Sequence, residues 1–271
     1  MSVNLTFLLV AAVNLLAMSQ CAAEEMARVR FELTVARQWV NKESDPQAAT
    51  ELERATSSKD AAPNDYVPCS DAAVVGLVPG RLRKHKSEVV QRWLKDIGKP
   101  LPPRDHSFRI KNGNFSPRLM IIRTGDSIVQ TRESGPLRFR GMLYNQQSTI
   151  FPRPGWKNPF ERREPAPVSV SSLDLGRRNP ELELRKAYLL IVEHTCTGIS
   201  SDTGIVELSG LPVGVKIPMR AVYPWQPLNR LTFESSTLEF SKTGFFYLRC
   251  DKPQGNTHHI RIMPKVPTEH R

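Results

Sequence analysis

The chain has 271 residues, 39% of them apolar, and this length can bury a sizeable core in one large or two small domains. Its 22 prolines argue against a mostly helical fold, because proline lacks the backbone donor that a helix interior requires. With 38 Lys and Arg against 27 Asp and Glu, the net charge of +11 attracts polyanions, although a basic surface also serves solubility alone.

The N-terminal segment, residues 1–23, has the pattern of a secretory signal peptide. Residues 5–18 are almost all apolar, but the run is shorter than the ~20 residues that a transmembrane helix needs. Small residues at Cys21 and Ala23 fit cleavage after Ala23, and charge begins immediately afterwards. We therefore predict a secreted or periplasmic, cell-envelope protein with no transmembrane segment in its mature chain. A lipid anchor on Cys21 fits less well, because Met18–Gln20 does not form a lipobox, and a buried N-terminal helix is the other alternative.

Removal of such a signal peptide leaves three of the four cysteines, Cys69, Cys196 and Cys250. An odd number leaves at least one free thiol in an exported protein, and the sequence does not select a disulfide pair. The chain contains no Cys-x-x-Cys, so neither a zinc ribbon nor a thioredoxin-type site is indicated.

Residues 24–106 form an N-terminal region with one predicted strand and one predicted helix. Apolar and polar residues alternate strictly over 27–35, as in a half-buried strand. Residues 42–64 are polar and rich in turn formers, which predicts a surface loop. Over 87–97 the apolar residues share one helical face, and Gly98 follows as a stop signal. This pattern predicts a short amphipathic helix that covers the core.

From His106 onward the pattern changes to short strands separated by turn signals. The sequences Asn112-Gly113 and Thr124-Gly-Asp126 mark two of these turns. Such spacing predicts an antiparallel β-sandwich. The predicted strands in this part of the chain cover residues 108–111, 119–122, 127–131, 187–192, 205–208, 215–221, 237–240, 245–248 and 260–262.

Four segments of the chain resemble motifs of one family. They are His106–Pro117, Arg118–Asp126, Pro167–Ser172 and Ala187–His194. Together they make residues 107–196 similar to the cupredoxin-like domain of exported bacterial proteins, of the methylamine-utilisation or plastocyanin-like type. The resemblance implies an all-β fold in which this part is a Greek-key β-sandwich.

The C-terminal part, residues 197–265, resembles the β-rich tail of carboxypeptidase regulatory-like and transthyretin-like modules. Ser201–Gly214 follows that family's order of turn and strand residues, and Lys242–Phe246 and Lys252–Gly255 are similar to its final hairpin. The expected organisation is therefore a signal peptide (1–23), an N-terminal region (24–106), a cupredoxin-like sandwich (107–196) and a smaller transthyretin-like β region (197–265).

The copper ligands of cupredoxins are missing from the positions that the resemblance implies. A blue-copper site needs two imidazoles, a thiolate and usually a weak thioether. The resemblance places the first imidazole at Phe139 and the thiolate at Ser172, and Leu173–Pro180 replaces the run that carries the remaining ligands. We therefore expect a sandwich without a metal or another cofactor.

A second set of copper-ligand residue types lies near the C-terminus, at Cys250, His258, His259 and Met263. A copper-binding electron-transfer protein of cupredoxin type is therefore the alternative function. Seven residues separate Cys250 from His258, which is more than copper loops usually have. Adjacent residues of a strand point to opposite faces, so His258 and His259 cannot chelate one ion together, and surface histidines are the simpler interpretation.

Known catalytic motifs are missing from the sequence. It contains no Gly-x-Ser-x-Gly, no His-Glu-x-x-His and no phosphate-binding glycine-rich loop. We therefore predict that the protein is not an enzyme. Nucleic acid is not an expected partner, because the protein is predicted to be exported and carries no nucleic-acid recognition motif.

Three aromatic residues in proline-flanked loops, Trp156, Tyr223 and Trp225, are candidates for stacking on sugar rings. Packing over the ends of the sandwich is the alternative for the same rings. Rings combined with positive charge suit acidic glycans, because charge supplies affinity while the rings stack on sugar faces. The predicted function is a non-catalytic exported binding or structural module of the cell envelope, with an acidic envelope polysaccharide as partner ahead of a protein.

Overall fold

The computed structural model describes residues 26–36, 66–78, 80–111, 113–142, 155, 157–164, 166–172, 186–225 and 231–265. Within them the regular structure is β-strand except for two helices, α4 (Gly80–Arg83) and α5 (Glu88–Ile97). The prediction of an all-β fold with a short helix near 87–97 is therefore confirmed. The predicted signal peptide, the predicted loop over 42–64, and Trp156 lie outside the described residues.

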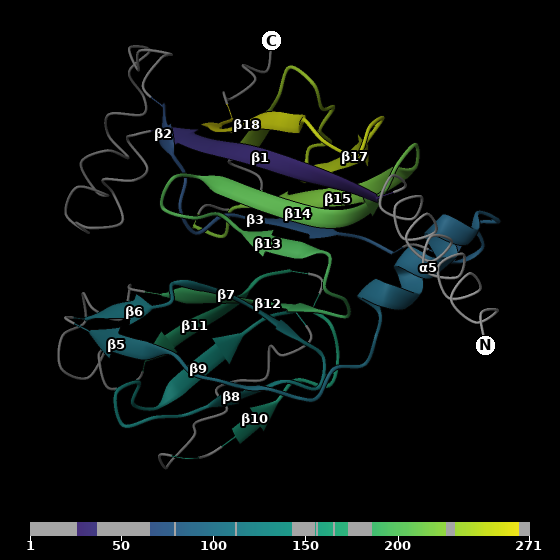
Figure 1. Cartoon of the computed structure of the whole chain (residues 1–271). Coiled ribbons are helices and arrows are strands. Elements are labelled where there is room, and N and C mark those ends of the chain that lie inside the picture. Colours follow the sequence, from purple (N-terminus) through teal and green to yellow (C-terminus); the bar gives the residue numbers. More distant parts are fainter. Residues whose placement is uncertain are drawn as a thin grey trace, which may run out of the picture.

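The strands form two units, which lie one above the other in Figure 1. The strands of the first, upper unit are β1 (Met26–Ala36), β2 (Tyr66–Pro68), β3 (Ala73–Gly76), β13 (Thr197–Ile199), β14 (Ile205–Pro212), β15 (Lys216–Val222), β16 (Leu231–Glu234), β17 (Phe245–Arg249) and β18 (Asn256–Pro264). One sheet has the order β14-β1-β18-β16, with β2 attached to β1, and the facing sheet has the order β13-β3-β15-β17.

The second, lower unit is made of shorter strands around its own core. They are β4 (Asp105–His106), β5 (Arg109–Lys111), β6 (Asn114–Ser116), β7 (Leu119–Arg123), β8 (Ser127–Val129), β9 (Leu137–Arg140), β10 (Lys157–Pro159), β11 (Val168–Ser172) and β12 (Ala187–Val192). The largest sheet has the order β7-β12-β11-β9, and it is accompanied by the sheet β10-β8-β4 and the pair β5-β6. Side chains such as Phe108, Phe160 and Leu189 are fully buried between them.

The first unit is built from both ends of the described chain. β1 runs parallel to β18, with Val29 opposite Asn256 and Val35 opposite Ile262, and antiparallel to β14. β3 likewise lies between β13 and β15. The second unit, residues 105–192, is therefore inserted between the helices and β13. The strand predicted over 27–35 and the unpredicted β3, both in the N-terminal region, therefore share the two sheets with the C-terminal β region.

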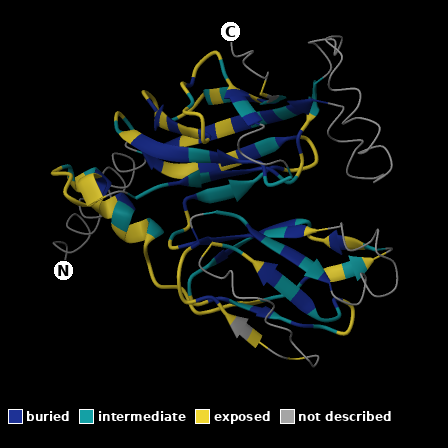
Figure 2. Ribbon diagram, turned by 180° about the vertical axis from the view of Figure 1, so that it is seen from behind, coloured by how far each residue is buried: buried dark blue, intermediate teal, exposed yellow. Residues whose placement is uncertain are grey.

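The core of the first unit is filled by the alternate residues of each strand that point inward, between the two sheets. Phe31 of β1 meets Phe246 of β17 edge-on across the two sheets, with 6.0 Å between ring centroids. α5 covers one end of this core with the buried ring of Trp93. Figure 2 shows buried residues along the strands of both units, and exposed residues mainly on the helices and loops. Full burial of one large apolar side chain contributes about 1.5–3 kcal/mol.

A third apolar cluster joins the two units. Ala73 of β3 and Val222 of β15 lie on one side of it, and Leu119 of β7 and Leu190 of β12 on the other. In Figure 1, β3 and β13 lie directly above β7 and β12. The outer face of one sheet in each unit is therefore used to hold the units together.

A buried carboxylate fastens the segment before β4 onto the second unit. Asp126 is 3% exposed, and its side chain accepts hydrogen bonds from the backbone N–H groups of Arg104 (2.9 Å) and Arg123 (3.0 Å). Nε2 of His106 lies 3.1 Å from Oδ2. Burial by itself raises the pKa of Asp126, but these hydrogen bonds outweigh burial and hold the pKa below its usual value.

We expect Asp126→Asn to lower the free energy of unfolding by about 2 kcal/mol at pH 7, because an amide NH₂ replaces an acceptor for a buried backbone donor. The carboxylate contributes its stability above the pKa of the unfolded chain, about 3.9, and this contribution is lost as the pH falls through the lower pKa of the folded chain. Urea titrations between pH 7 and pH 2 should show the difference between the two proteins shrinking in acid. A difference that stays constant over this range would contradict the assignment.

Candidate functional site

The four residues considered as copper ligands near the C-terminus do not point to one place. His258 lies on the inner face of β18, whereas His259 and Met263 lie on its outer face. Cys250 is buried just after β17, where its backbone forms an isolated parallel β-bridge with Val213. In the part of the chain that the structure describes, no three His, Cys, Asp or Glu side chains are grouped to hold a metal ion. Strand alternation separates the two imidazoles, as the sequence indicates.

Each of the two histidines has its own partner. Nδ1 of His258 lies 2.8 Å from Oγ1 of Thr237, and the ring stacks on Phe31 with 5.8 Å between ring centroids. Burial lowers the pKa of His258, so its neutral form is favoured. Nδ1 of His259 lies 3.0 Å from Oε2 of Glu32 on the neighbouring strand. Both side chains therefore contribute to the packing and pairing of the sheet.

Cys196 and Cys250 are free thiols, and the side chains of Cys69, Cys196 and Cys250 are all buried in the first core. Burial raises the pKa of Cys196 to about 12 and that of Cys250 to about 11. Both thiols are therefore protonated at neutral pH, and the thiolate is the form that acts as a nucleophile or binds metal. In this structure the three side chains serve as small apolar residues.

The positions at which the resemblance implies copper ligands face the core of the second unit. Phe139 on β9 packs edge-on against Phe160, with 5.6 Å between ring centroids. Ser172 on β11 is 2% exposed and lies opposite Leu137 of β9. A phenyl ring offers no donor atom and a neutral hydroxyl is a poor ligand for copper, so these residues do not fit the metal.

Neither of the two loop aromatics that the structure describes has a ring free to stack on a sugar. Tyr223 is 3% exposed and lies in the first core. Trp225 lies at the junction of the units, where the guanidinium of Arg118 is 4.0 Å from its ring centroid and Tyr188 meets it edge-on at 4.9 Å. Its Nε1–H donates to the backbone oxygen of Asp71 at 3.3 Å. Both rings therefore pack against other side chains, Tyr223 in the first core and Trp225 at the junction.

The outer face of β15 and β17 carries a different aromatic surface. The strands pair antiparallel, and Ile217, Met219, Phe246 and Leu248 all point into the core. The alternate residues face outward in three opposing pairs: Lys216 with Arg249, Pro218 with Tyr247, and Arg220 with Phe245. We call this surface the aromatic–basic face and define it by Lys216, Arg220, Phe245, Tyr247 and Arg249, together with Arg81 of α4.

Both rings of the aromatic–basic face are exposed, and each makes a cation–π contact with an arginine. Tyr247 is 53% exposed and Phe245 is 37% exposed. The guanidinium of Arg220 lies 5.0 Å from the ring centroid of Phe245, and that of Arg81 lies 5.0 Å from the ring centroid of Tyr247. Nη2 of Arg81 also donates to the hydroxyl oxygen of Tyr247 at 2.5 Å. Exposed cation–π contacts contribute about 0.5–1 kcal/mol each, so they hold rings and cations in a defined arrangement.

Sequence reasoning missed the aromatic–basic face, although the pattern of the residues that β17 contributes to it is present in the sequence. Residues 245–249 read Phe-Phe-Tyr-Leu-Arg, in which two rings and a cation alternate over the predicted strand 245–248 and the residue that follows it. The residues that β15 contributes, Lys216 and Arg220, become relevant only when β15 is known to be the neighbour of β17. β16 intervenes in the sequence and belongs to the other sheet, so this pairing is not a local hairpin.

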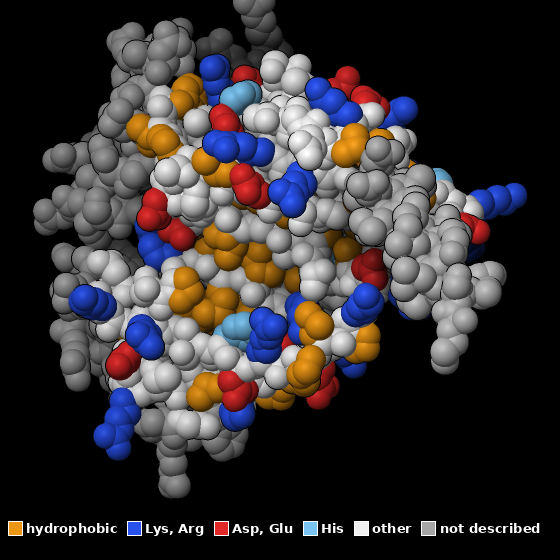
Figure 3. Space-filling model, in the orientation of Figure 1, with side chains coloured by type: hydrophobic (Ala, Val, Ile, Leu, Met, Phe, Trp, Pro, Cys, Tyr) orange, Lys and Arg blue, Asp and Glu red, His pale blue; other side chains and the backbone are white. Residues whose placement is uncertain are grey.

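Positive charge by itself does not locate a site on this protein. Figure 3 shows Lys and Arg side chains on both units, with Asp and Glu side chains among them. On the same side of the molecule, hydrophobic side chains gather in a band at the height where the units meet. A binding surface is therefore better identified by the coincidence of exposed rings and cations than by charge density.

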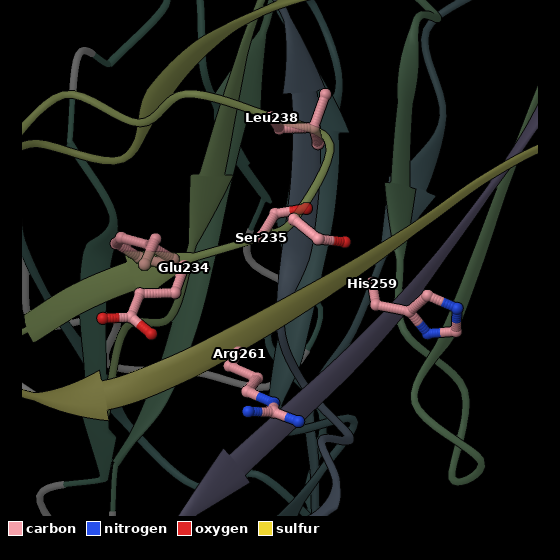
Figure 4. A pocket seen from close by; sticks show the side chains of 7 residues that line it. Glu234, Ser235, Leu238, His259 and Arg261 are labelled. Carbon is pink, nitrogen blue, oxygen red and sulfur yellow. The ribbon is translucent and has the colours of Figure 1, made fainter.

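A hollow of about 590 Å³ lies beside β16 and β18 (Figure 4). Its imidazole and its guanidinium already have partners, because Nδ1 of His259 lies 3.0 Å from Oε2 of Glu32 and the guanidinium of Arg261 lies 5.5 Å from the ring centroid of Tyr66. Glu234 of β16 is the register partner of Arg261 of β18, and Figure 4 shows the two side chains projecting to the same side. The hollow is lined by Phe233, Glu234, Ser235, Ser236, Leu238, His259 and Arg261.

Neither of the two described helices has the length and apolar character that crossing a membrane requires. Comparisons of the chain with protein-family models, with curated proteins and with solved structures gave no match. Function is therefore inferred from the residues of the aromatic–basic face.

We expect Trp225→Ala to weaken the junction between the units and to lower the free energy of unfolding by about 2 kcal/mol. The variant loses a cation–π contact, an edge-on aromatic contact and apolar burial together. Trp225→Phe keeps a ring beneath Arg118 and should cost less than half as much. Urea unfolding of both variants beside the wild type measures the effect, and an Ala variant as stable as the wild type would exclude this role for the ring.

Proposed function

We propose that the protein is an exported, non-catalytic binding or structural module of the cell envelope and that it binds an acidic glycan. In this proposal residues 1–23 are a secretion signal and 107–196 are a cupredoxin-like sandwich without its copper. Residues 197–265 are the carboxypeptidase regulatory-like or transthyretin-like part. The N-terminal signal pattern supports export, and the order of the strand and turn motifs supports the family.

The aromatic–basic face is the observation that carries the proposed ligand. Phe245 and Tyr247 are two residues apart on β17, so their Cα atoms are about 7 Å apart along the strand at ~3.3 Å per residue, and both side chains lie on the same face. Four basic side chains surround these rings. Each ring has a guanidinium over it, but Tyr247 and Phe245 remain exposed, unlike the half-buried Trp225. Sugar rings can stack on this exposed aromatic surface through their apolar faces, while guanidinium groups bind carboxylate, sulfate or phosphate substituents. An acidic glycan supplies both kinds of group.

The aromatic–basic face suits a protein partner less well. Docking of a protein usually needs a contiguous apolar patch, whereas here each of the two exposed rings lies beneath a guanidinium. Single-stranded nucleic acid also binds to rings flanked by cations. Predicted export is the feature that favours a glycan over nucleic acid.

We expect Tyr247→Ala and Phe245→Ala to weaken binding to an acidic polysaccharide about tenfold each, because loss of one stacking ring removes about 1–1.5 kcal/mol. The purified mature protein is applied to immobilised dextran sulfate and to immobilised polygalacturonate, and it is eluted with a gradient of NaCl. Both variants should elute at lower salt than the wild type.

Tyr66→Ala is the matched control for this experiment, because Tyr66 also lies beneath an arginine, Arg261, but on the other sheet. It should elute with the wild type. If the ring variants also elute with the wild type, retention comes from charge alone, which salt screens over ~8 Å at physiological ionic strength. Preferential release by poly(dT) would favour nucleic acid, and a lack of retention at low salt would remove the glycan proposal.

We also expect the mature chain to begin at Glu24, since small residues occupy the two positions that signal peptidase reads before it. Intact-mass measurement of the protein from an exporting host tests this directly. A chain that still begins at Met1, or a mass that includes acyl chains on Cys21, would contradict the export route proposed here.

A further inference from the structure

Two cations of the aromatic–basic face lie directly opposite each other on neighbouring strands. Lys216 of β15 is the register partner of Arg249 of β17. The N–H of Leu77 donates to the backbone oxygen of Pro218, and the N–H of Ala221 donates to that of Gly244. Even-numbered residues of β15 therefore turn their backbone groups away from β17. The Lys216–Arg249 pair is thus a non-hydrogen-bonded pair, the kind in which side chains approach most closely.

This arrangement is unfavourable for the protein alone. Like charges directly opposite each other on a sheet destabilise it. Nε of Arg249 lies 2.9 Å from Oδ1 of Asp251, but both side chains are more than half exposed, so this ion pair offsets little. Lys216 is exposed and makes no ion pair with any residue that the structure describes. The pair therefore retains an excess of positive charge that an anion can neutralise.

We infer that Lys216 and Arg249 form a subsite for an oxyanion substituent of the glycan, a sulfate, phosphate or carboxylate group. The inference rests on the proposed function and adds to it the position of the charged group. A guanidinium and an ammonium across one strand spacing, ~4.8 Å, can bind two oxygens of the same anion. Tyr247 occupies the next outward position on β17, so the sugar that carries the substituent stacks on its ring.

Cations on an edge strand also protect a sheet from pairing with another chain. β17 is an edge strand, and Arg249 is placed to act in this way. Edge protection by Arg249 does not require a second cation on β15, because β17 is the edge strand and Lys216 lies on the strand next to it. Lys216 is therefore the residue that distinguishes an oxyanion subsite from edge protection.

The test compares Lys216→Gln with Lys95→Gln, which removes the same charge from the exposed side of α5, and with Tyr247→Ala. Thermal unfolding is measured without ligand, and affinity is measured for dextran sulfate, polygalacturonate and neutral dextran. Without ligand, Lys216→Gln should raise the melting temperature by about 1–3 °C, because a like-charge repulsion is relieved. Its affinity for an acidic polymer should fall about tenfold, and that of Lys95→Gln by less than twofold.

A gain in stability together with a loss of affinity in Lys216→Gln supports the subsite, and the polymer that shows the larger loss identifies a sulfate ester or a carboxylate as the substituent. Equal affinity of Lys216→Gln and Lys95→Gln, with Tyr247→Ala still weakened, overturns the subsite and leaves the proposed function standing. Failure of the wild type to bind either acidic polymer overturns the proposed function and the subsite with it.

Discussion

The parallel pairing of β1 with β18 is the contact on which the rest of the structure depends. β1 lies between β14 and β18, and its inward residues Val29, Phe31 and Leu33 fill the middle of the first core. The two strands come from nearly opposite ends of the described chain. The entropy lost on closing so long a loop grows only slowly with its length, so a continuous ladder and a shared core can offset it. Once the ladder forms, the second unit is held as an insertion.

The two units differ in how far apart in the sequence their paired strands lie. The strands of the second unit all come from residues 105–192, so its sheets form from one continuous segment. The first unit must bring β1 and β3 to strands that follow residue 196. Non-local pairing slows folding, because the entropy of closing a long loop is lost before the stabilising contacts between the strands can form. We therefore expect the second unit to be the part that can form early.

One set of strand pairs produces both the core and the proposed binding surface. The register that places Met219 opposite Phe246 in the core also places Arg220 opposite Phe245 outside. Because the side-chain period of a strand is two, a slip of one residue would exchange the two faces. The burial of the inner residues therefore fixes the geometry of the outer ones. The loop aromatics differ, since Tyr223 and Trp225 are used to fill a core and a junction.

The sequence by itself determined the properties that depend on neighbouring residues. Proline frequency and the alternation over 27–35 indicated strands, and the apolar face over 87–97 with Gly98 after it indicated α5. Alternation also showed that His258 and His259 point apart. Only the tertiary structure decided which strands pair. The sequence shows that a strand has an apolar face to bury, but several other strands could cover that face equally well. The union of β1 with β18, the place of Trp225 between two units and the opposition of Lys216 to Arg249 all depend on those choices, so no local pattern could reveal them.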